Sequence, residues 1–181
     1  MHTLAKLLWI KYSQPKIFDR ATAMLLPKDY VRYRLTGEIA TEYSDASSTL
    51  MLDINRLRWS EEIVDTMGIP VSILPPLSAS HEIVGEVTKV SSEETGLSPG
   101  TAVVAGGADT GCSYLGLGVL RSGDLGLYQG SSASVYACSP FFRKDRNMMT
   151  ITRCHVAPRT LMTGGGLSTA GSLMTWAREM L

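Results

Sequence analysis

The segment Val103-Val104-Ala105-Gly106-Gly107-Ala108-Asp109-Thr110-Gly111 constrains the fold of this chain more than any other. An apolar run ends in three small residues, which let a backbone or a ligand come close because no large side chain intervenes. Asp109 follows at the start of an expected helix, where its carboxylate fits equally a helix N-cap and a general base that accepts a proton. The segment predicts a strand, a tight turn and a helix, with one carboxylate at the junction.

A second loop of small and hydroxyl residues, Gly130-Ser131-Ser132-Ala133-Ser134, follows further along the chain. Backbone N–H groups and hydroxyls in such a loop can surround a phosphate. Taken alone, the loop is more typical of an ordinary hairpin turn. A proton acceptor followed by a phosphate-binding loop nevertheless points to phosphoryl transfer to an alcohol.

Composition excludes several classes of protein. The 181 residues suffice for one domain or for pieces of two, and the 17 basic residues balance the 17 acidic ones, which disfavours a nucleic-acid binder. No apolar run approaches the length of a membrane span, and no secretory signal opens the chain. The three cysteines are an odd number without metal-ligand spacing, so we expect neither a disulfide framework nor a zinc site, and a cytoplasmic location.

Hydrophobic periodicity and capping residues predict an alternation of helices and strands. Expected helices cover residues 3–12, 15–25, 27–37, 60–67, 91–96 and 168–181, with another that begins at Thr110. Expected strands cover residues 83–90, 101–105, two arms within 124–138, 148–153 and 160–163. We expect the apolar strand 101–105 to be buried inside a mixed sheet. Gly164-Gly165-Gly166 lacks the Lys-Ser/Thr of a P-loop and indicates a flexible turn before the last helix.

Seven stretches, in order and across nearly the whole chain, resemble the FGGY carbohydrate kinases, and most of all their xylulokinases. The stretches are Leu26–Glu38, Ser44–Asp53, Trp59–Glu62, Thr101–Thr110, Gly130–Ala133, Cys154–Pro158 and Leu167–Trp176. The resemblance implies an α/β chain with the actin-like ATPase (ribonuclease H-like) fold, a mixed sheet with flanking helices. Residues 1–118 would be the end of the first, sugar-binding domain, and residues 119–181 the start of the second, ATP-binding domain.

The same resemblance implies the roles of individual residues. Asp109 matches the catalytic base that deprotonates the sugar hydroxyl, and Thr110 stands beside it where the family binds substrate. The implied nucleotide-binding residues are Gly130, Ser131, Ser132, Gly171 and Thr175. The implied cofactors are ATP and Mg²⁺, and no residue of the chain is assigned as a metal ligand.

By this resemblance, the complete enzyme would phosphorylate a sugar hydroxyl, converting D-xylulose to xylulose 5-phosphate. Gluconate, ribulose and glycerol are alternative substrates, the partners are the sugar and ATP, and a homodimer is a further expectation. Three departures, Ala108 and Ala133 for glycine and Thr110 for Asn or Gln, leave open a non-catalytic sugar- or nucleotide-binding remnant. A hydrolase that uses Ser131 or Cys112 as its nucleophile is a further alternative. The sequence argues against it, because it lacks the Gly-x-Ser-x-Gly elbow and a histidine at a recognisable position.

The family's first phosphate loop and its adenosine loop have no counterpart in these residues. We therefore expect that the isolated 181 residues neither bind ATP tightly nor catalyse phosphoryl transfer. Incomplete sheets would also expose strand edges and apolar surface, which favours self-association.

Overall fold

The computed structural model describes residues 2–142 and 144–180. The chain divides into two compact units, Met1–Ala108 and Asp109–Leu181. None of the helices in the described residues is long and apolar enough to cross a membrane.

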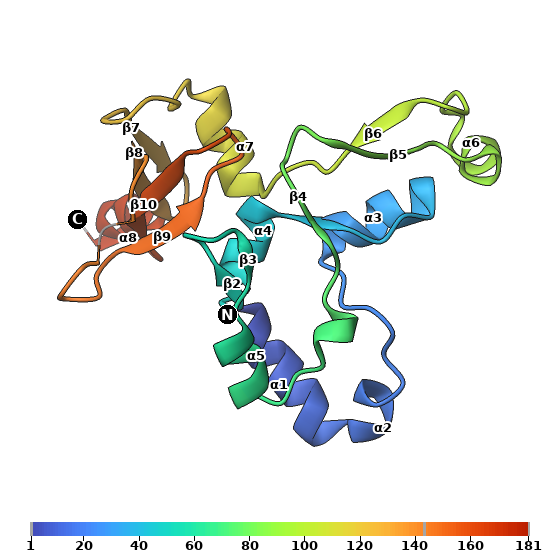
Figure 1. The fold of residues 1–181 in the computed structure, drawn as a ribbon. Coiled ribbons are helices and arrows are strands. Elements are labelled where there is room, and N and C mark those ends of the chain that lie inside the picture. Colours follow the sequence, from blue (N-terminus) through green and yellow to red (C-terminus); the bar gives the residue numbers. More distant parts are fainter. Residues whose placement is uncertain (1, 143, 181) are drawn as a thin grey trace. The chain divides into compact units, whose positions relative to one another are not determined.

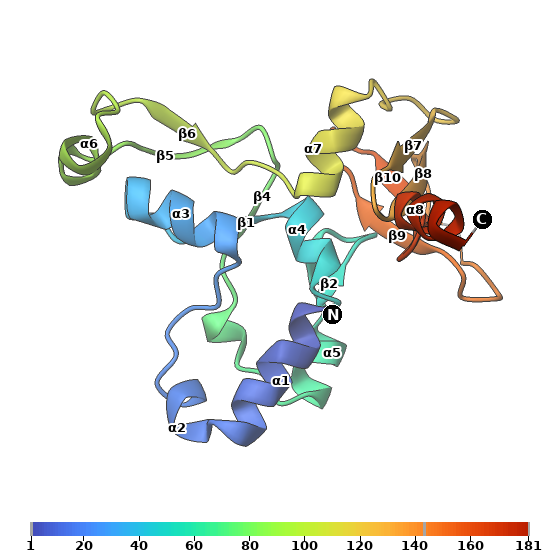
Figure 2. The same cartoon turned by 180° about the vertical axis from the view of Figure 1, so that it is seen from behind.

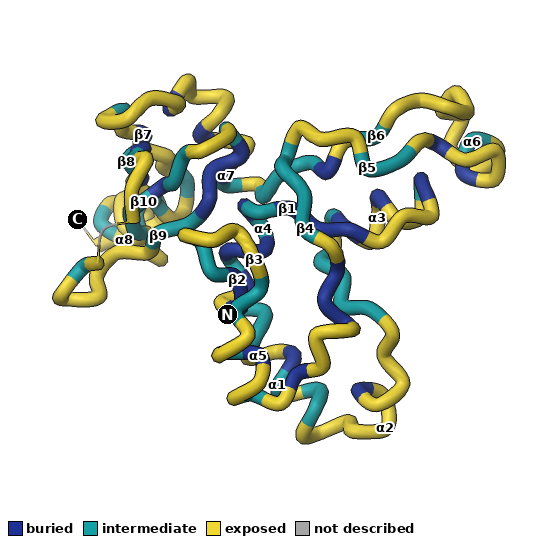
Figure 3. Tube along the Cα trace, in the orientation of Figure 1, coloured by how far each residue is buried: buried dark blue, intermediate teal, exposed yellow. Residues whose placement is uncertain are grey.

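The first unit is mainly helical (Figure 1). Its helices are α1 (Thr3–Ser13), α2 (Pro15–Phe18), α3 (Pro27–Thr36), α4 (Tyr43–Ser48), α5 (Glu61–Thr66), the 3₁₀ turn η1 (Val71–Ile73) and α6 (Lys89–Thr95). Its hydrophobic core consists of Leu7, Phe18, Met51, Val64, Ile69, Ile73 and Leu74. Figure 3 shows a second concentration of buried residues along β1 (Thr41–Glu42) and α4. Most of that second set is polar, so hydrogen bonds must compensate its burial.

The strands of this unit pair two by two. β1 runs parallel to β4 (Leu77–Ser78), and β2 (Leu52–Asp53) lies antiparallel to β3 (Arg58–Trp59). β5 (Ile83–Glu86) pairs antiparallel with β6 (Ala102–Val104). The prediction of a buried strand at 101–105 is wrong in its burial, because β6 pairs with β5 alone and Val104 is 46% exposed.

Capping signals predicted helix ends well. α3 begins at Pro27 and ends before Gly37, whose φ of +78° is the left-handed conformation that glycine adopts without strain. α5 begins after Ser60, whose hydroxyl accepts a hydrogen bond from the N–H of Ile63. These two helices are confirmed because their boundaries are set by residues next to each other in sequence.

Two predictions in the first unit are wrong in extent, and one helix of this unit was not predicted. α2 ends at Phe18 rather than near residue 25, and Met24 beyond it donates its N–H to the carbonyl of Ile73 instead. The strand predicted to Val90 ends at Glu86, because Thr88 caps α6 by accepting a hydrogen bond from Ser91 N–H. α4 was not predicted, and its N-cap is the buried Glu42.

The second unit is one antiparallel sheet with two helices. α7 (Asp109–Gly116) leads into strands β7 (Leu125–Gln129), β8 (Ala133–Ser139), β9 (Ile151–Cys154) and β10 (Leu161–Leu167), in the sheet order β7-β8-β10-β9. α8 (Gly171–Met180) follows, and it lies in front of the sheet in the view of Figure 2. A small core of Tyr114, Val119, Tyr136, Cys138 and Met162 lies under α7.

The three consecutive glycines form part of a strand, so the predicted turn at Gly164–Gly166 is wrong. They extend β10, with Gly164 opposite Tyr136 and Gly166 opposite Ser134 of β8. A Cβ atom at Gly164 would lie 1.9 Å from the carbonyl oxygen of Val135. Glycine at this position therefore lets two strands approach more closely than any side chain permits.

Candidate active site

Asp109 is the first residue of α7 and its side chain is exposed. Its Oδ1 accepts hydrogen bonds from the N–H of Thr110 at 2.6 Å and from the Thr110 hydroxyl at 3.2 Å. Oδ2 makes no hydrogen bond to a described residue. The arrangement fixes the carboxylate through one oxygen and leaves the other open to accept a proton.

The loop before Asp109 is held by polar contacts within the first unit. Arg32 Nη1 donates to the carbonyl oxygen of Ala105 at 2.6 Å. The N–H of Ala108 donates to Ser44 Oγ at 2.9 Å, and that hydroxyl donates to Glu42 Oε1 at 2.7 Å. Gly106, with φ of +81°, makes the turn between these two anchors. Hydrogen bonds at Ala105 and Ala108 thus hold the backbone that leads to Asp109 on both sides of Gly106.

These anchors belong to a buried charge network that the sequence did not predict. Asp29 and Glu42 are fully buried and Arg32 is only 4% exposed. Lys28 Nζ lies 2.8 Å from Asp29 Oδ1, 3.7 Å from Glu42 Oε1 and 3.5 Å from Asp45 Oδ2. Arg32 Nη1 lies 3.1 Å from Asp29 Oδ1. Burial raises the pKa of the Asp45 carboxyl, and Lys28 opposes that rise. The available signal was the spacing of Lys28, Asp29 and Arg32 on one helix, which places the two cations about one turn apart.

The turn Gly130–Ser132 joins β7 to β8, as a hairpin with Gln129 opposite Ala133. Gly130 N–H donates to the carbonyl of Ser132 at 2.7 Å, and the side chains of Ser131 and Ser132 are exposed. The hydroxyls predicted to face phosphate are therefore accessible to solvent.

The start of α8 packs directly on this turn. Gly171 N–H donates to the Gly130 carbonyl at 2.9 Å, and Ala170 N–H donates to the Ser131 carbonyl at 2.8 Å. A Cβ atom at Gly171 would lie 2.4 Å from the Gly130 oxygen. Gly171 thus lies against Gly130, whereas Thr175 is exposed further along α8.

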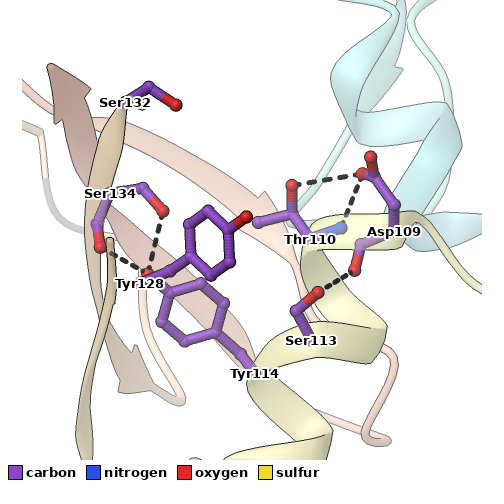
Figure 4. Close-up of a pocket in the computed structure, with 7 residues that line it drawn as sticks. All are labelled: Asp109, Thr110, Ser113, Tyr114, Tyr128, Ser132 and Ser134. Atoms are coloured by element: carbon purple, nitrogen blue, oxygen red, sulfur yellow. Dashed lines mark hydrogen bonds between the residues drawn. The ribbon is translucent and has the colours of Figure 1, made fainter. Parts of the chain in front are cut away.

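Asp109 and the hairpin meet around one cavity of about 290 Å³ (Figure 4). Its lining residues are Asp109, Thr110, Ser113, Tyr114, Tyr128, Ser132 and Ser134. Of the residues predicted for the site, Asp109, Thr110 and Ser132 line this cavity, whereas Gly130, Ser131, Gly171 and Thr175 are not among its lining residues. A carboxylate and several hydroxyls therefore face the same space.

Tyr114 sets the distance between α7 and the hairpin, a role that the sequence did not reveal. Its hydroxyl donates to the Ser134 carbonyl at 2.9 Å, and its ring packs edge-on against Tyr136 with centroids 5.4 Å apart. A Cβ atom at Gly126 would lie 2.6 Å from the Tyr114 ring. The absence of a side chain at Gly126 is what lets this ring approach the backbone of β7.

Comparison with known proteins gives matches to carbohydrate kinases, in sequence and in structure. The sequence pattern described as "FGGY family of carbohydrate kinases, N-terminal domain" matches residues 1–116. "Xylulose kinase" of Bacillus subtilis is 40% identical over 177 residues, and "Autoinducer-2 kinase" of Enterobacter sp. is 31% identical over 179 residues. These alignments cover 98% and 99% of this chain, but only 36% and 34% of those proteins. The crystal structure of xylulose kinase from Rhodospirillum rubrum superposes with a TM-score of 0.92 at 28% identity, over 99% of this chain and 36% of that one.

Proposed function

We propose, because the chain belongs to the FGGY family of carbohydrate kinases, that the cavity between α7 and the β7–β8 hairpin is part of a phosphoryl-transfer site. One observation carries the proposal: Asp109 and Ser132 line the same cavity. The chain spans 36% of the length of the Bacillus relative, so the activity belongs to the complete protein that contains these residues.

Asp109 acts as the general base in this proposal. Its Oδ2 takes the proton of a sugar hydroxyl, whose oxygen then attacks the terminal phosphorus of ATP. The bond from that phosphorus to the bridging oxygen breaks, and ADP leaves with the electron pair. Thr110 holds Oδ1 through two hydrogen bonds, so the direction of Oδ2 is fixed before the substrate arrives.

The hairpin supplies donors for phosphate. The N–H groups and hydroxyls of Ser131 and Ser132 surround phosphate oxygens, while Gly130 and Gly171 bring α8 against the turn and hold its shape. Thr175 extends the same face of α8 toward the nucleotide. Mg²⁺ would neutralise phosphate charge when bound, but the described residues contain no cluster that could hold a metal ion, so none is assigned to it.

D-xylulose is the first candidate substrate, because two relatives that are 40% and 37% identical to this chain carry the name xylulose kinase. Thr110 offers a single hydroxyl where the family has an amide, and here that hydroxyl contacts Asp109. Gluconate, ribulose and glycerol are the other acceptors to test. The assignment of residues 1–118 and 119–181 to a sugar-binding and an ATP-binding domain remains part of this proposal.

Backbone geometry argues against the non-catalytic remnant. The described non-glycine residues with positive φ are Leu50, Leu57, Met148 and Arg159. Ala108 and Ala133, which replace family glycines, are not among them, so neither substitution strains its loop. The two alanines leave the base and the hairpin in place.

The test is a coupled ADP-release assay on the complete kinase, with D-xylulose, gluconate, ribulose and glycerol. We expect turnover with one of them, and Asp109→Asn to reduce kcat by about 10²- to 10⁴-fold. Asp65→Asn, an exposed carboxylate on α5, is the matched control and should keep full activity. Turnover that survives in Asp109→Asn would refute the base assignment, and no turnover with any sugar would favour the remnant.

A further inference from the structure

A second cavity of about 380 Å³ adjoins the first one in the second unit. Its lining residues are Thr110, Ser132, Ala133, Ser134, Tyr136, Arg153, Gly166, Leu167 and Ser168. Thr110, Ser132 and Ser134 line both cavities, so the two spaces share a rim of hydroxyl groups. Asp109 lines the first cavity, and Arg153 lines the second.

The sheet explains how Arg153 reaches this place. Arg153 lies on β9 opposite Met162 of β10, and Met162 lies opposite Cys138 of β8. Directly opposed residues project from the same face of a sheet, so the Arg153 side chain shares a face with the core under α7. The next positions of β10 on that face are Gly164 and Gly166. Two positions without side chains leave room for a long guanidinium side chain beside them.

Arg153 is a cation without a partner in the described part of the chain. Its Nε is buried and has no hydrogen-bond partner, and no ion pair or hydrogen bond joins its guanidinium to another described residue. The second cavity has no acidic lining residue. A buried donor without an acceptor carries an uncompensated desolvation penalty, which an anionic ligand in the cavity would remove.

The contrast with Arg32 makes this environment informative. Arg32 is buried and Arg153 half-buried, but the guanidinium of Arg32 donates to Asp29, to the Ala105 carbonyl and to the Ala40 carbonyl. Where this fold buries an arginine for structure, it provides acceptors. Arg153 has hydroxyls and backbone around it, and hydroxyls can donate to the same anion that the arginine binds.

We propose that Arg153 binds oxygens of the polyphosphate chain of ATP, which would extend from the Gly130–Ser132 hairpin into the second cavity. The inference rests on the proposed kinase function. It adds to that function a positively charged side chain that binds phosphate. Guanidinium groups bind phosphate through two parallel N–H···O bonds, which fixes orientation as well as charge. Arg153 then neutralises charge on the phosphates, while Asp109 accepts the proton at the other side of the shared rim.

The first test measures binding directly on this chain. Tripolyphosphate is added to isotope-labelled protein, and the Nε–H resonance of Arg153 is followed by NMR. We expect that resonance to shift, and Arg153→Gln to weaken tripolyphosphate binding by about 10- to 100-fold. Arg121→Gln, which removes an exposed arginine from the loop before β7, is the control and should bind like the parent. An unmoved Arg153 resonance at saturating tripolyphosphate would overturn the proposal.

A pentose 5-phosphate is the second probe, because the sugar product also carries a phosphate. Tripolyphosphate should shift the Arg153 resonance at lower concentration than the sugar phosphate does. A stronger response to the sugar phosphate would contradict the assignment to the nucleotide and place the product phosphate in this cavity.

The second test uses the complete kinase. Arg153→Gln should raise the KM for ATP by about 10-fold or more and leave the KM for the sugar unchanged, with partial recovery in Arg153→Lys. Equal ATP KM values in the parent and Arg153→Gln would refute the role of Arg153, while sugar turnover would still support the kinase. Conversely, if the unsubstituted kinase phosphorylates no sugar, the proposed function is refuted. The NMR experiment with tripolyphosphate still decides whether Arg153 binds phosphate.

Discussion

The two units differ in whether their charged side chains have partners. In the first, Asp29, Arg32 and Glu42 are buried, and each makes an ion pair or hydrogen bonds. In the second, Asp109 presents a free oxygen to one cavity and Arg153 lines another without a described partner. Paired charges hold a backbone in place, whereas open charges remain available to a ligand. The first unit therefore fixes the loop that leads to the site, and the second unit carries the groups that act.

The comparison predicts its largest effect on stability in the first unit. Arg32→Met removes one cation from a buried ion pair, leaving Lys28 as the remaining cation beside Asp29, and should destabilise this unit by about 3–5 kcal/mol. The measurement is urea unfolding followed by NMR signals of α3 and β1. Arg34→Met on the same helix, whose pair with Glu94 is exposed, is the matched control and should change little. Equal losses in both variants would contradict a structural role for buried pairing.

The second prediction concerns the close approach of strands in the second unit. Gly164→Ala places a methyl group against the Val135 carbonyl and should destabilise the sheet by about 1–3 kcal/mol. Hydrogen exchange of peptides from β8 and β10 reports the loss. Gly116→Ala at the end of α7, where a Cβ atom meets nothing within 4 Å, serves as the control. Unchanged protection of β8 in Gly164→Ala would mean that the strands can separate at no cost.

A third, smaller effect tests how α7 is held on the hairpin. Tyr114→Phe keeps the ring contact with Tyr136 but removes the hydrogen bond to Ser134, for an expected loss of about 0.5–1.5 kcal/mol. Thermal unfolding of the variant gives the value. Tyr128→Phe removes an exposed hydroxyl from the same cavity, and we expect its stability to match the parent. A larger loss in Tyr128→Phe than in Tyr114→Phe would reverse the assignment.

The smallest effect is an opposite pH dependence of the two units. Burial lowers the pKa of His155, whose Nδ1 accepts a hydrogen bond from Ala157 N–H, so the second unit should lose stability as pH falls below about 6.5, the ordinary histidine value. Burial raises the pKa of Asp45, so the first unit should lose stability as pH rises above about 3.9, the ordinary aspartate value, through the raised pKa. Unfolding of each unit, followed by NMR between about pH 4 and about pH 7, gives the slope of its stability against pH. Asp45→Asn and His155→Gln should flatten one slope each, and slopes of the same sign in the two units would contradict the prediction.

Local signals predicted much of the fold. Pro27 and Gly37 bounded α3, Ser60 opened α5, and the small turn before Ala133 joined β7 to β8 as expected. The prediction of an FGGY carbohydrate kinase with an α/β fold is confirmed by the family pattern, the relatives and the solved structures. In each case the decisive residues are neighbours in sequence or recur as motifs.

The errors arose where distant residues decide the outcome. The glycines of β10 were interpreted as a turn because their composition favours one, yet close approach to Val135 makes them a strand. The charge network on α3 was missed because Glu42 and Ala105 reach Lys28 and Arg32 only after folding. Arg153 was missed for the same reason, since nothing near it in sequence indicates a cavity.

The sequence by itself determined the family, the helix caps and the candidate base Asp109, because each depends on a local pattern of residue types. Tertiary structure alone decided which charges are buried and which face a cavity, since both depend on long-range packing of the chain. Asp109 and Asp29 are the same residue type near the start of a helix. Only folding buries Asp29 beside the two cations of its own helix and leaves Asp109 exposed with a free oxygen.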